Sequence, residues 1–195
     1  MVMKSKTILI AVLAILFSFK GFSQEQIVPH WSDIPSGVYK LVISGEVRVV
    51  IKKDRKKNHY DFGTDIKEYI ASGQERNGSS FVNNGTIEIT KADLGSNSQL
   101  RLFIKDQIMD IELRDGALLI YDSKISQPSM NVKINNAKLY SSKKFSINNF
   151  VIENRKGILE LLKANLKSAV LNISPNSENT VGGNVSKLQI HVIQR

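Results

Sequence analysis

Apolar residues recur at intervals of about twenty positions through the second half of the chain. Five short segments, 109–113, 130–134, 150–154, 169–173 and 188–192, carry mostly apolar residues at their first, third and fifth positions. The central residues of these segments lie 21, 20, 19 and 19 positions apart and form the set Ile111, Val132, Ile152, Leu171 and Ile190. A second series at twenty-residue spacing comprises Ala117, Ala137 and Gly157, together with Leu119, Leu139 and Leu159. Such a repeat indicates stacked coils, each too small to bury its own apolar face.

Side chains alternate between the two faces of a strand, so the first, third and fifth residues of each segment should point inward. The fourth residues then form an outward ladder of Glu112, Lys133, Glu153, Asn172 and His191. Like charges are never adjacent in this order, and Lys133 beside Glu112 favours an ion pair. Each such contact is worth about 0.2–1 kcal/mol.

Two positions allow alternative interpretations. Asn154 falls on an inward position and is either a buried residue satisfied by backbone groups or the first residue of a turn over 154–157, and we favour the turn. Residues 157–171 have apolar positions at helical spacing and strong helix formers. We predict a strand there because the repeat register passes through the segment, with a helix interrupting the stack as the alternative.

The pattern predicts an all-β, β-helix-like stack of ~20-residue coils with a less regular N-terminal β cap. No linker or composition break divides it, so we expect one domain over 24–195, with cap and hairpins at 24–99 and regular coils at 100–195. Within the cap we predict a helical turn at 65–70, a hairpin around Asn84 and Gly85, and a loop at 91–98.

The first 23 residues have the organisation of a secretory signal peptide. Lys4 and Lys6 precede an apolar run at 8–19, and small residues lead to a cleavage position before Gln24. The run is shorter than the ~20 residues of a spanning helix, although an uncleaved membrane anchor is the alternative. The chain has no cysteine, which excludes a lipoprotein anchor. We therefore expect an exported protein of the periplasm or the cell surface.

Basic residues outnumber acidic ones, giving a formal net charge of +9. Loss of Lys4, Lys6 and Lys20 with the signal peptide lowers this value to +6. For an exported protein, this charge favours lipopolysaccharide, anionic lipid or acidic polysaccharide over nucleic acid, with a solvated basic surface as the alternative. The densest cluster comprises Lys52, Lys53, Arg55, Lys56 and Lys57. It is a candidate weak site for an anionic partner, or else a hairpin tip kept soluble by its charge.

The sequence contains no motif for catalysis, a metal or a cofactor. His30, His59 and His191 are far apart, and no Gly-rich phosphate loop is present. Asp106, Asp110, Glu112 and Asp115 are close in sequence, and Asp122 could lie near them on a second strand. This cluster supports the alternative of a carbohydrate-active enzyme acting on acidic polysaccharide. The simpler interpretation of Asp110 and Glu112 is a solvated strand face.

The order of these features resembles the DUF2807 family (auto-transporter adhesin, head GIN domain). The match rests on strands at 38–51 around Gly45, on 65–70, on 84–89 and on the repeat over 104–192. The family's Gly-Ser-Gly turns are replaced here by Arg-Asp-Gly, Asn-Asn-Ala and Arg-Lys-Gly. The Phe-Ser-Gln junction at 22–24 also resembles cleavage sites of Bacteroidetes. The resemblance implies a right-handed β-helix-like fold and an exported adhesion protein, with no catalytic residues.

We therefore expect an exported, non-enzymatic envelope protein that acts as an adhesin-like or structural binding module. Its expected partners are an envelope glycan, lipopolysaccharide or another protein. The last coil, at 188–192, offers an open edge for self-association.

Overall fold

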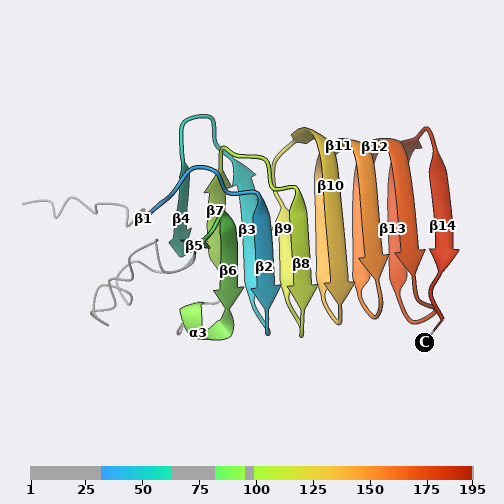
Figure 1. The fold of residues 1–195 in the computed structure, drawn as a ribbon, viewed down its shortest axis with the longest axis horizontal. Helices are drawn as coiled ribbons and strands as arrows, with labels where there is room; N and C mark the ends of the chain where they lie inside the picture. The colour runs from blue at the N-terminus through green and yellow to red at the C-terminus, as the bar shows by residue number, and fades with distance from the viewer. Residues whose placement is uncertain (1–31, 63–81, 95–98, 195) are drawn as a thin grey trace, which may run out of the picture.

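The computed structural model describes residues 32–62, 82–94 and 99–194, and within them the fold is all-β with one short helix. The predicted signal peptide and the helical turn expected at 65–70 lie outside the described residues. The elements in chain order are β1 (Ser32–Ile34), β2 (Lys40–Ser44), β3 (Arg48–Lys53), β4 (Asn58–Phe62), β5 (Val82–Asn83), β6 (Thr86–Thr90), α3 (Lys91–Leu94), β7 (Leu100–Ile104), β8 (Asp110–Arg114), β9 (Leu118–Tyr121), β10 (Ile125–Asn135), β11 (Lys138–Asn154), β12 (Ile158–Ile173), β13 (Glu178–Val185) and β14 (Leu188–Val192). The strands side by side in Figure 1 belong to one 14-stranded sheet.

Parallel pairing between successive repeats arranges most of these strands in three columns. The first column stacks 48–51, 118–121, 138–141, 158–161 and 178–181. The second stacks 125–127, 145–147, 164–166 and 183–185. The third stacks 40–44, 110–114, 131–135, 150–154 and 169–173, and ends on β14. The chain passes from the third column through a tight turn to the first, and then through the second back to the third.

The ladder register predicted from the repeat is confirmed residue by residue. Ile111, Val132, Ile152, Leu171 and Ile190 are successive partners in the third column, and so are the outward residues from Glu112 to His191. The second series is confirmed through the pairs of Leu139 with Leu119 and with Leu159. The apolar inward residues from Ile111 to Leu171 are buried in one core, but Met109, also predicted to point inward, is 38% exposed. The predicted ion pair of Lys133 with Glu112 is wrong, because Glu112 instead pairs with Arg114 at 2.9 Å and Lys40 at 3.9 Å.

The segment with helical spacing is strand β12, as the repeat register predicted. It pairs with β11 on one side and with β13 and β14 on the other. A helix would give up these backbone hydrogen bonds and the burial of Leu159, Leu161 and Leu166. Register shifts between Leu161 and Ala164 bend the strand as it passes from the first column to the second.

We favoured Asn154 as the first residue of a turn, but the structure shows the alternative, a buried residue satisfied by hydrogen bonds. It is fully buried as the last residue of β11, and its amide braces the following turn from inside. Its Oδ1 accepts a hydrogen bond from the Gly157 backbone at 2.9 Å, while Nδ2 donates to Gly157 and Asn179. An added Cβ at Gly157 would stand 2.2 Å from Ile134 Cγ2, so the tight corner itself requires glycine.

The N-terminal region adds strands that the repeat did not reveal. β2 pairs in parallel with both β6 and β8, and β3 pairs with both β7 and β9. The predicted hairpin is confirmed as β5 and β6, with positive φ at Asn84 and Gly85. The loop expected at 91–98 begins instead with helix α3, whose Asp93 carboxylate accepts hydrogen bonds from the Thr90 backbone and hydroxyl.

Candidate functional site

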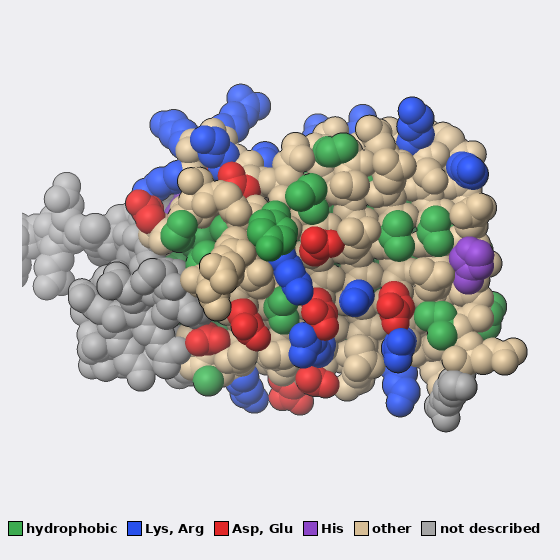
Figure 2. Space-filling view, viewed as in Figure 1, with side chains coloured by type: hydrophobic (Ala, Val, Ile, Leu, Met, Phe, Trp, Pro, Cys, Tyr) green, Lys and Arg blue, Asp and Glu red, His purple; other side chains and the backbone are tan. Residues whose placement is uncertain are grey.

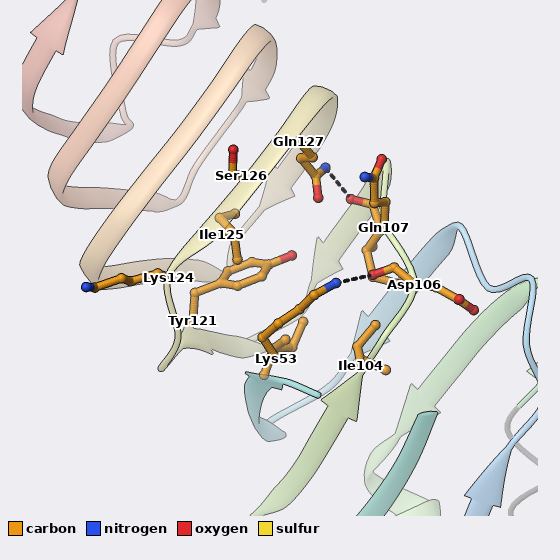
Figure 3. Close-up of a pocket in the computed structure, with 11 residues that line it drawn as sticks. Lys53, Ile104, Asp106, Gln107, Tyr121, Lys124, Ile125, Ser126 and Gln127 are labelled. Atoms are coloured by element: carbon orange, nitrogen blue, oxygen red, sulfur yellow. Dashed lines mark hydrogen bonds between the residues drawn. The ribbon is translucent and has the colours of Figure 1, made fainter. Parts of the chain in front are cut away.

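A small pocket opens where the second column begins. It lies between the β7–β8 connection and the chain from the end of β9 into β10, and its volume is about 50 Å³. Figure 3 shows Lys53, Tyr121 and Gln127 around this space. Ile51, Ile104, Ile108 and Ile125 supply apolar wall. The pocket therefore combines a few polar groups with apolar surface, as binding sites for small molecules do.

Hydrogen bonds of Asn58 and Asp106 hold the β7–β8 connection, which forms one wall of the pocket, in place. The buried Asn58 amide accepts from the backbone of Lys105 at 2.8 Å and donates to the Asp106 carboxylate at 2.6 Å. The same carboxylate accepts from the backbones of Gly37 and Val38 at 2.8 and 3.0 Å. Partial burial raises the pKa of Asp106, but these hydrogen bonds outweigh burial and hold the pKa below its ordinary value. Asp106, a candidate acid in the sequence, thus holds backbone in place.

Tyr121 ends β9 and is almost completely buried. Its ring packs edge-on against Phe145, with centroids 5.7 Å apart. Its hydroxyl has no hydrogen-bond partner in the described part of the chain. Burial raises the pKa of Tyr121 well above its ordinary value, so the hydroxyl stays protonated at neutral pH. A buried hydroxyl without a partner costs free energy, and this position therefore calls for an explanation.

Lys53 and Gln127 flank the same space from opposite sides (Figure 3). Lys53 Nζ donates to the Lys105 carbonyl at 2.5 Å and to the Asp106 carbonyl at 3.4 Å. Gln127 Nε2 donates to the carbonyls of Ile108 at 2.8 Å and Ser129 at 2.7 Å. These contacts hold both side chains against the loop and orient the Gln127 amide, because only its nitrogen can face two carbonyls.

The five basic residues predicted as an anionic site are not equivalent. Lys52 and Lys53 belong to β3, while Arg55, Lys56 and Lys57 lie on the β3–β4 connection. β3 and β4 do not pair with each other but flank β7, so the interpretation as a hairpin tip is wrong. Lys52 lies 3.5 Å from Asp122, and Lys57 lies 2.5 Å from Asp33. Figure 2 shows Lys and Arg side chains gathered where this connection projects.

Asp54 shapes the basic connection. Its carboxylate accepts a hydrogen bond from the Lys56 backbone at 2.6 Å, which lowers the pKa of Asp54 below its ordinary value. No ion pair within the described ranges involves Arg55 or Lys56. Of the five, Lys53 faces the pocket, and Arg55 and Lys56 project without an ion-pair partner among the residues that the structure describes.

The acids considered for catalysis are engaged separately. Asp110 accepts from Asn131 Nδ2 at 2.9 Å, and Asp115 occupies a turn with φ of 55°. Asp110 and Glu112 belong to the third column, whereas Asp122 follows β9 of the first. Asp122 lies between Lys52 at 3.5 Å and Lys143 at 3.6 Å. The simpler interpretation of a solvated, charge-paired surface accounts for all of these contacts.

The histidines are dispersed. His59 is buried and stacked on Phe103 with centroids 4.5 Å apart, His191 is exposed on β14, and His30 lies outside the described residues. Among the residues that the structure describes, no group of three His, Cys, Asp or Glu side chains could hold a metal ion.

β14, the last strand of the third column, presents apolar side chains to solvent. Leu188, Ile190 and Val192 are 51, 54 and 65% exposed, whereas Ile111 in the same ladder is 2% exposed. β13 and β14 each pair only with β12, so the opposite edge of both strands is unpaired in the described sheet. The sequence predicted this open edge at 188–192.

Sequence analysis missed Tyr121 and Gln127. Tyr121 occupies an inward repeat position two residues after Leu119, and its signal in the sequence is a polar atom at a position where most inward residues are apolar. Gln127 belongs to a column that the periodic pattern did not resolve, because its rungs are only three residues long.

No protein-family model matches the chain, and no curated protein is recognisably similar to it in sequence. In the described segments, no helix combines the length and hydropathy needed to span a bilayer.

Proposed function

We propose that the protein is an exported, non-enzymatic module of the cell envelope that assembles with a second copy of itself through its open end. In this proposal the three columns form a right-handed β-helix-like stack. The known preference of parallel β crossovers for the right hand supports that handedness. The predicted signal peptide at 1–23 and the resemblance to DUF2807 adhesins support an envelope location, periplasmic or at the surface.

The observation that carries the proposal is the exposure of Leu188, Ile190 and Val192. They stack on Ala169, Leu171 and Ile173 of β12. Ala169 and Leu171 are at most 5% exposed, and Ile173 is partly buried. Burial of apolar surface contributes about 25 cal/mol per Å². A further β rung placed on β14 would therefore gain both apolar burial and backbone hydrogen bonds.

The composition of the open edge favours another copy as the occupant. β14 (Leu-Gln-Ile-His-Val) carries no Lys, Asp, Glu or Pro, and β13 carries only Glu178 as a charged residue. Natural edge strands are commonly protected by Lys, Pro or a bulge. β14 itself has none of these devices, and little charge repulsion opposes its self-pairing. Two β14 strands related by a two-fold axis would cover each other's apolar residues, which closes the assembly as a dimer.

Binding explains the surface better than catalysis does. Asp110, Glu112 and Asp122 each have their own charged or amide partner. A glycosidase needs two carboxyl groups on either side of the scissile bond, one of them free to carry a proton. We therefore do not advance the carbohydrate-active enzyme as a second function. Envelope glycan, lipopolysaccharide or protein remain the partners that the assembled module would contact.

Sedimentation velocity of the protein over a hundredfold concentration range tests the assembly. We expect the wild type to pass from monomer to dimer, and Ile190→Lys to remain monomeric because its charge would be buried at the pair. The matched control is Val151→Lys, which places the same charge on an exposed apolar residue of an interior rung. A wild type that stays monomeric throughout would contradict assembly.

Export is tested separately, by fractionation of cells that express the chain with and without residues 1–23. We expect the full chain in the periplasm or at the surface, shortened at Gln24, and the truncated chain in the cytosol. Retention of the full chain in the cytosol would contradict an envelope function.

A further inference from the structure

We propose that Tyr121, Lys53 and Gln127 form a binding site for a hydroxy-carboxylate, a carboxylate with a neighbouring hydroxyl group. This inference rests on the pocket at the start of the second column and is independent of assembly through the open end. Figure 3 shows the three side chains converging on the same space.

Tyr121 supplies the first donor. Its hydroxyl is buried without a partner in the described structure, and it lines the pocket. Desolvation raises its pKa, which keeps the proton on the oxygen. A protonated hydroxyl held in a fixed direction by the packing of its ring on Phe145 is suited to donate to an anion.

Lys53 supplies the charge and the second donor. A Lys ammonium has three N–H groups, and two of them point to the carbonyls of Lys105 and Asp106. One N–H group remains for a ligand. The Asp106 carboxylate does not compete for it, since that group is bonded to Asn58, Gly37 and Val38. Lys124 also lines the pocket, but Figure 3 shows its ammonium directed away from the other side chains. Lys53 and Tyr121 thus offer one positive charge and two donors, which match the single charge and two oxygens of a carboxylate.

Gln127 supplies the acceptor that makes the site selective. Both hydrogens of Nε2 are used by backbone carbonyls, so only Oε1 is free to face a ligand. An amide oxygen repels a carboxylate oxygen but accepts a hydrogen bond from a hydroxyl group. A ligand with a hydroxyl beside its carboxylate satisfies all three side chains.

The volume of the pocket limits the size of the ligand that it can hold. About 50 Å³ corresponds to the space of a few water molecules, because one water needs roughly 10–15 Å³ on this measure. The pocket can hold a carboxylate and its adjacent hydroxyl group, while a larger body must remain outside the mouth. Two sources offer a carboxylate with a hydroxyl nearby: a free 2-hydroxy acid, and a terminal uronic acid residue of a glycan, whose free 4-hydroxyl lies one carbon further from the carboxylate.

An NMR titration of the full chain with lactate, glucuronate, propionate and glucose tests the site and its selectivity. We expect saturable shifts at residues of the pocket with lactate or glucuronate, binding of propionate at least tenfold weaker, and none with glucose. Preference for lactate would identify a free acid as the source, and preference for glucuronate would identify a glycan. Absence of saturable shifts with both hydroxy-carboxylates would overturn the proposal.

Variants locate the binding. Tyr121→Phe and Lys53→Met should each weaken it by about tenfold, the value of one hydrogen bond to a charged group. Tyr140→Phe and the neighbouring Lys52→Met are matched controls outside the pocket and should leave it unchanged. Equal binding by Tyr121→Phe and the wild type would place the ligand elsewhere and overturn the assignment.

The ligand-free stability of Tyr121→Phe provides a second readout. Removal of an unsatisfied hydroxyl should raise Tm by about 2–4 °C, since loss of an unpaired polar group relieves its desolvation cost. At the same concentration, lactate or glucuronate should then raise the Tm of the wild type more than that of the variant. A lower Tm for ligand-free Tyr121→Phe would show that water already satisfies the hydroxyl, and it would contradict a site kept for a ligand.

Discussion

The two ends of the sheet differ in the length of their outermost strands and in the exposure of their inward residues. At the N-terminal end the outermost strands are β1 and β5, which are only 3 and 2 residues long. The inward residues of the adjoining β6, Ile87 and Ile89, are at most 1% exposed. At the C-terminal end the outermost strands are β13 and β14, of 8 and 5 residues, and the inward residues of β14 are more than half exposed.

The difference shows what a repeated rung requires. Each strand of a column packs its apolar residues against the next strand and forms backbone hydrogen bonds with it. An interior strand (rung) is therefore stable only between two neighbours. At the N-terminal end, the short strands β5 and β1 pair antiparallel with β6 and β4. The C-terminal end leaves this requirement unmet among the described residues, and the proposed assembly follows from that difference.

The largest effect should separate an interior rung from the open one. Val132→Asp buries a charge without a partner and should cost several kcal/mol, which we expect to appear as failure to fold or a large drop in the urea midpoint. Ile190→Asp, in the same ladder, should cost less than about 1 kcal/mol because the residue is exposed. Equal losses in urea denaturation would contradict the distinction between the two rungs.

Asn154 links the last rung to the interior. Its Nδ2 donates to Asn179, and its Oδ1 accepts from the buried Gly157 backbone. Asn154→Ala should therefore cost about 2–3 kcal/mol, because it leaves buried polar groups unsatisfied. Hydrogen exchange should rise first in β13 while β2 and β6 stay protected. Uniform acceleration over both ends would show that the residue has no local role there.

Asp106 has the corresponding role at the other end. Asp106→Asn should cost about 1–2 kcal/mol at neutral pH, since it weakens charge-assisted hydrogen bonds to Gly37 and Val38. The folded pKa of Asp106 lies below the ordinary value of 3.8. Its contribution is therefore present above about pH 3.8 and is lost as the pH falls through the folded pKa. The urea midpoints of variant and wild type should converge in that acid range, and a constant difference would contradict this role.

The smallest effect concerns the basic connection. Arg55→Gln with Lys56→Gln should change stability by less than about 0.5 kcal/mol, because surface charges contribute little. If this connection contacts anionic partners, the double variant should weaken binding to lipopolysaccharide or anionic vesicles, and wild-type binding should fall as added salt shortens the Debye length below ~10 Å. Salt-independent binding, or binding equal in the double variant, would leave the cluster as a solubilising surface.

The regular part of the fold could be predicted because its signal is periodic. Ile111, Val132, Ile152, Leu171 and Ile190 define the register of the third column without any structural information. The same register correctly predicted that β12 is a strand, although its apolar residues have helical spacing. Interleaving of β2 and β3 with β8 and β9 could not be predicted, since those strands lie some seventy residues from their partners and share no repeat with them.

The candidate sites also differ in whether a periodic signal in the sequence could predict them. The open edge at 188–192 was predicted from the repeat, and in the described sheet β14 pairs only with β12. The basic residues are visible as composition, but their separation into paired, pocket-facing and projecting cations depends on side-chain contacts. The pocket at Tyr121 could not be predicted, because it forms between the β7–β8 connection and the β9–β10 corner, neither of which is periodic.

Hydrogen–deuterium exchange of the wild type at two protein concentrations, a hundredfold apart, tests the difference between the two ends most directly. The account predicts that amides of β14 become protected as concentration rises, while those of β5 and β6 do not change. Ile190→Lys should abolish this concentration dependence. Exchange of β14 that is the same at both concentrations, with the fold intact, would contradict the claim that the open end is an assembly surface.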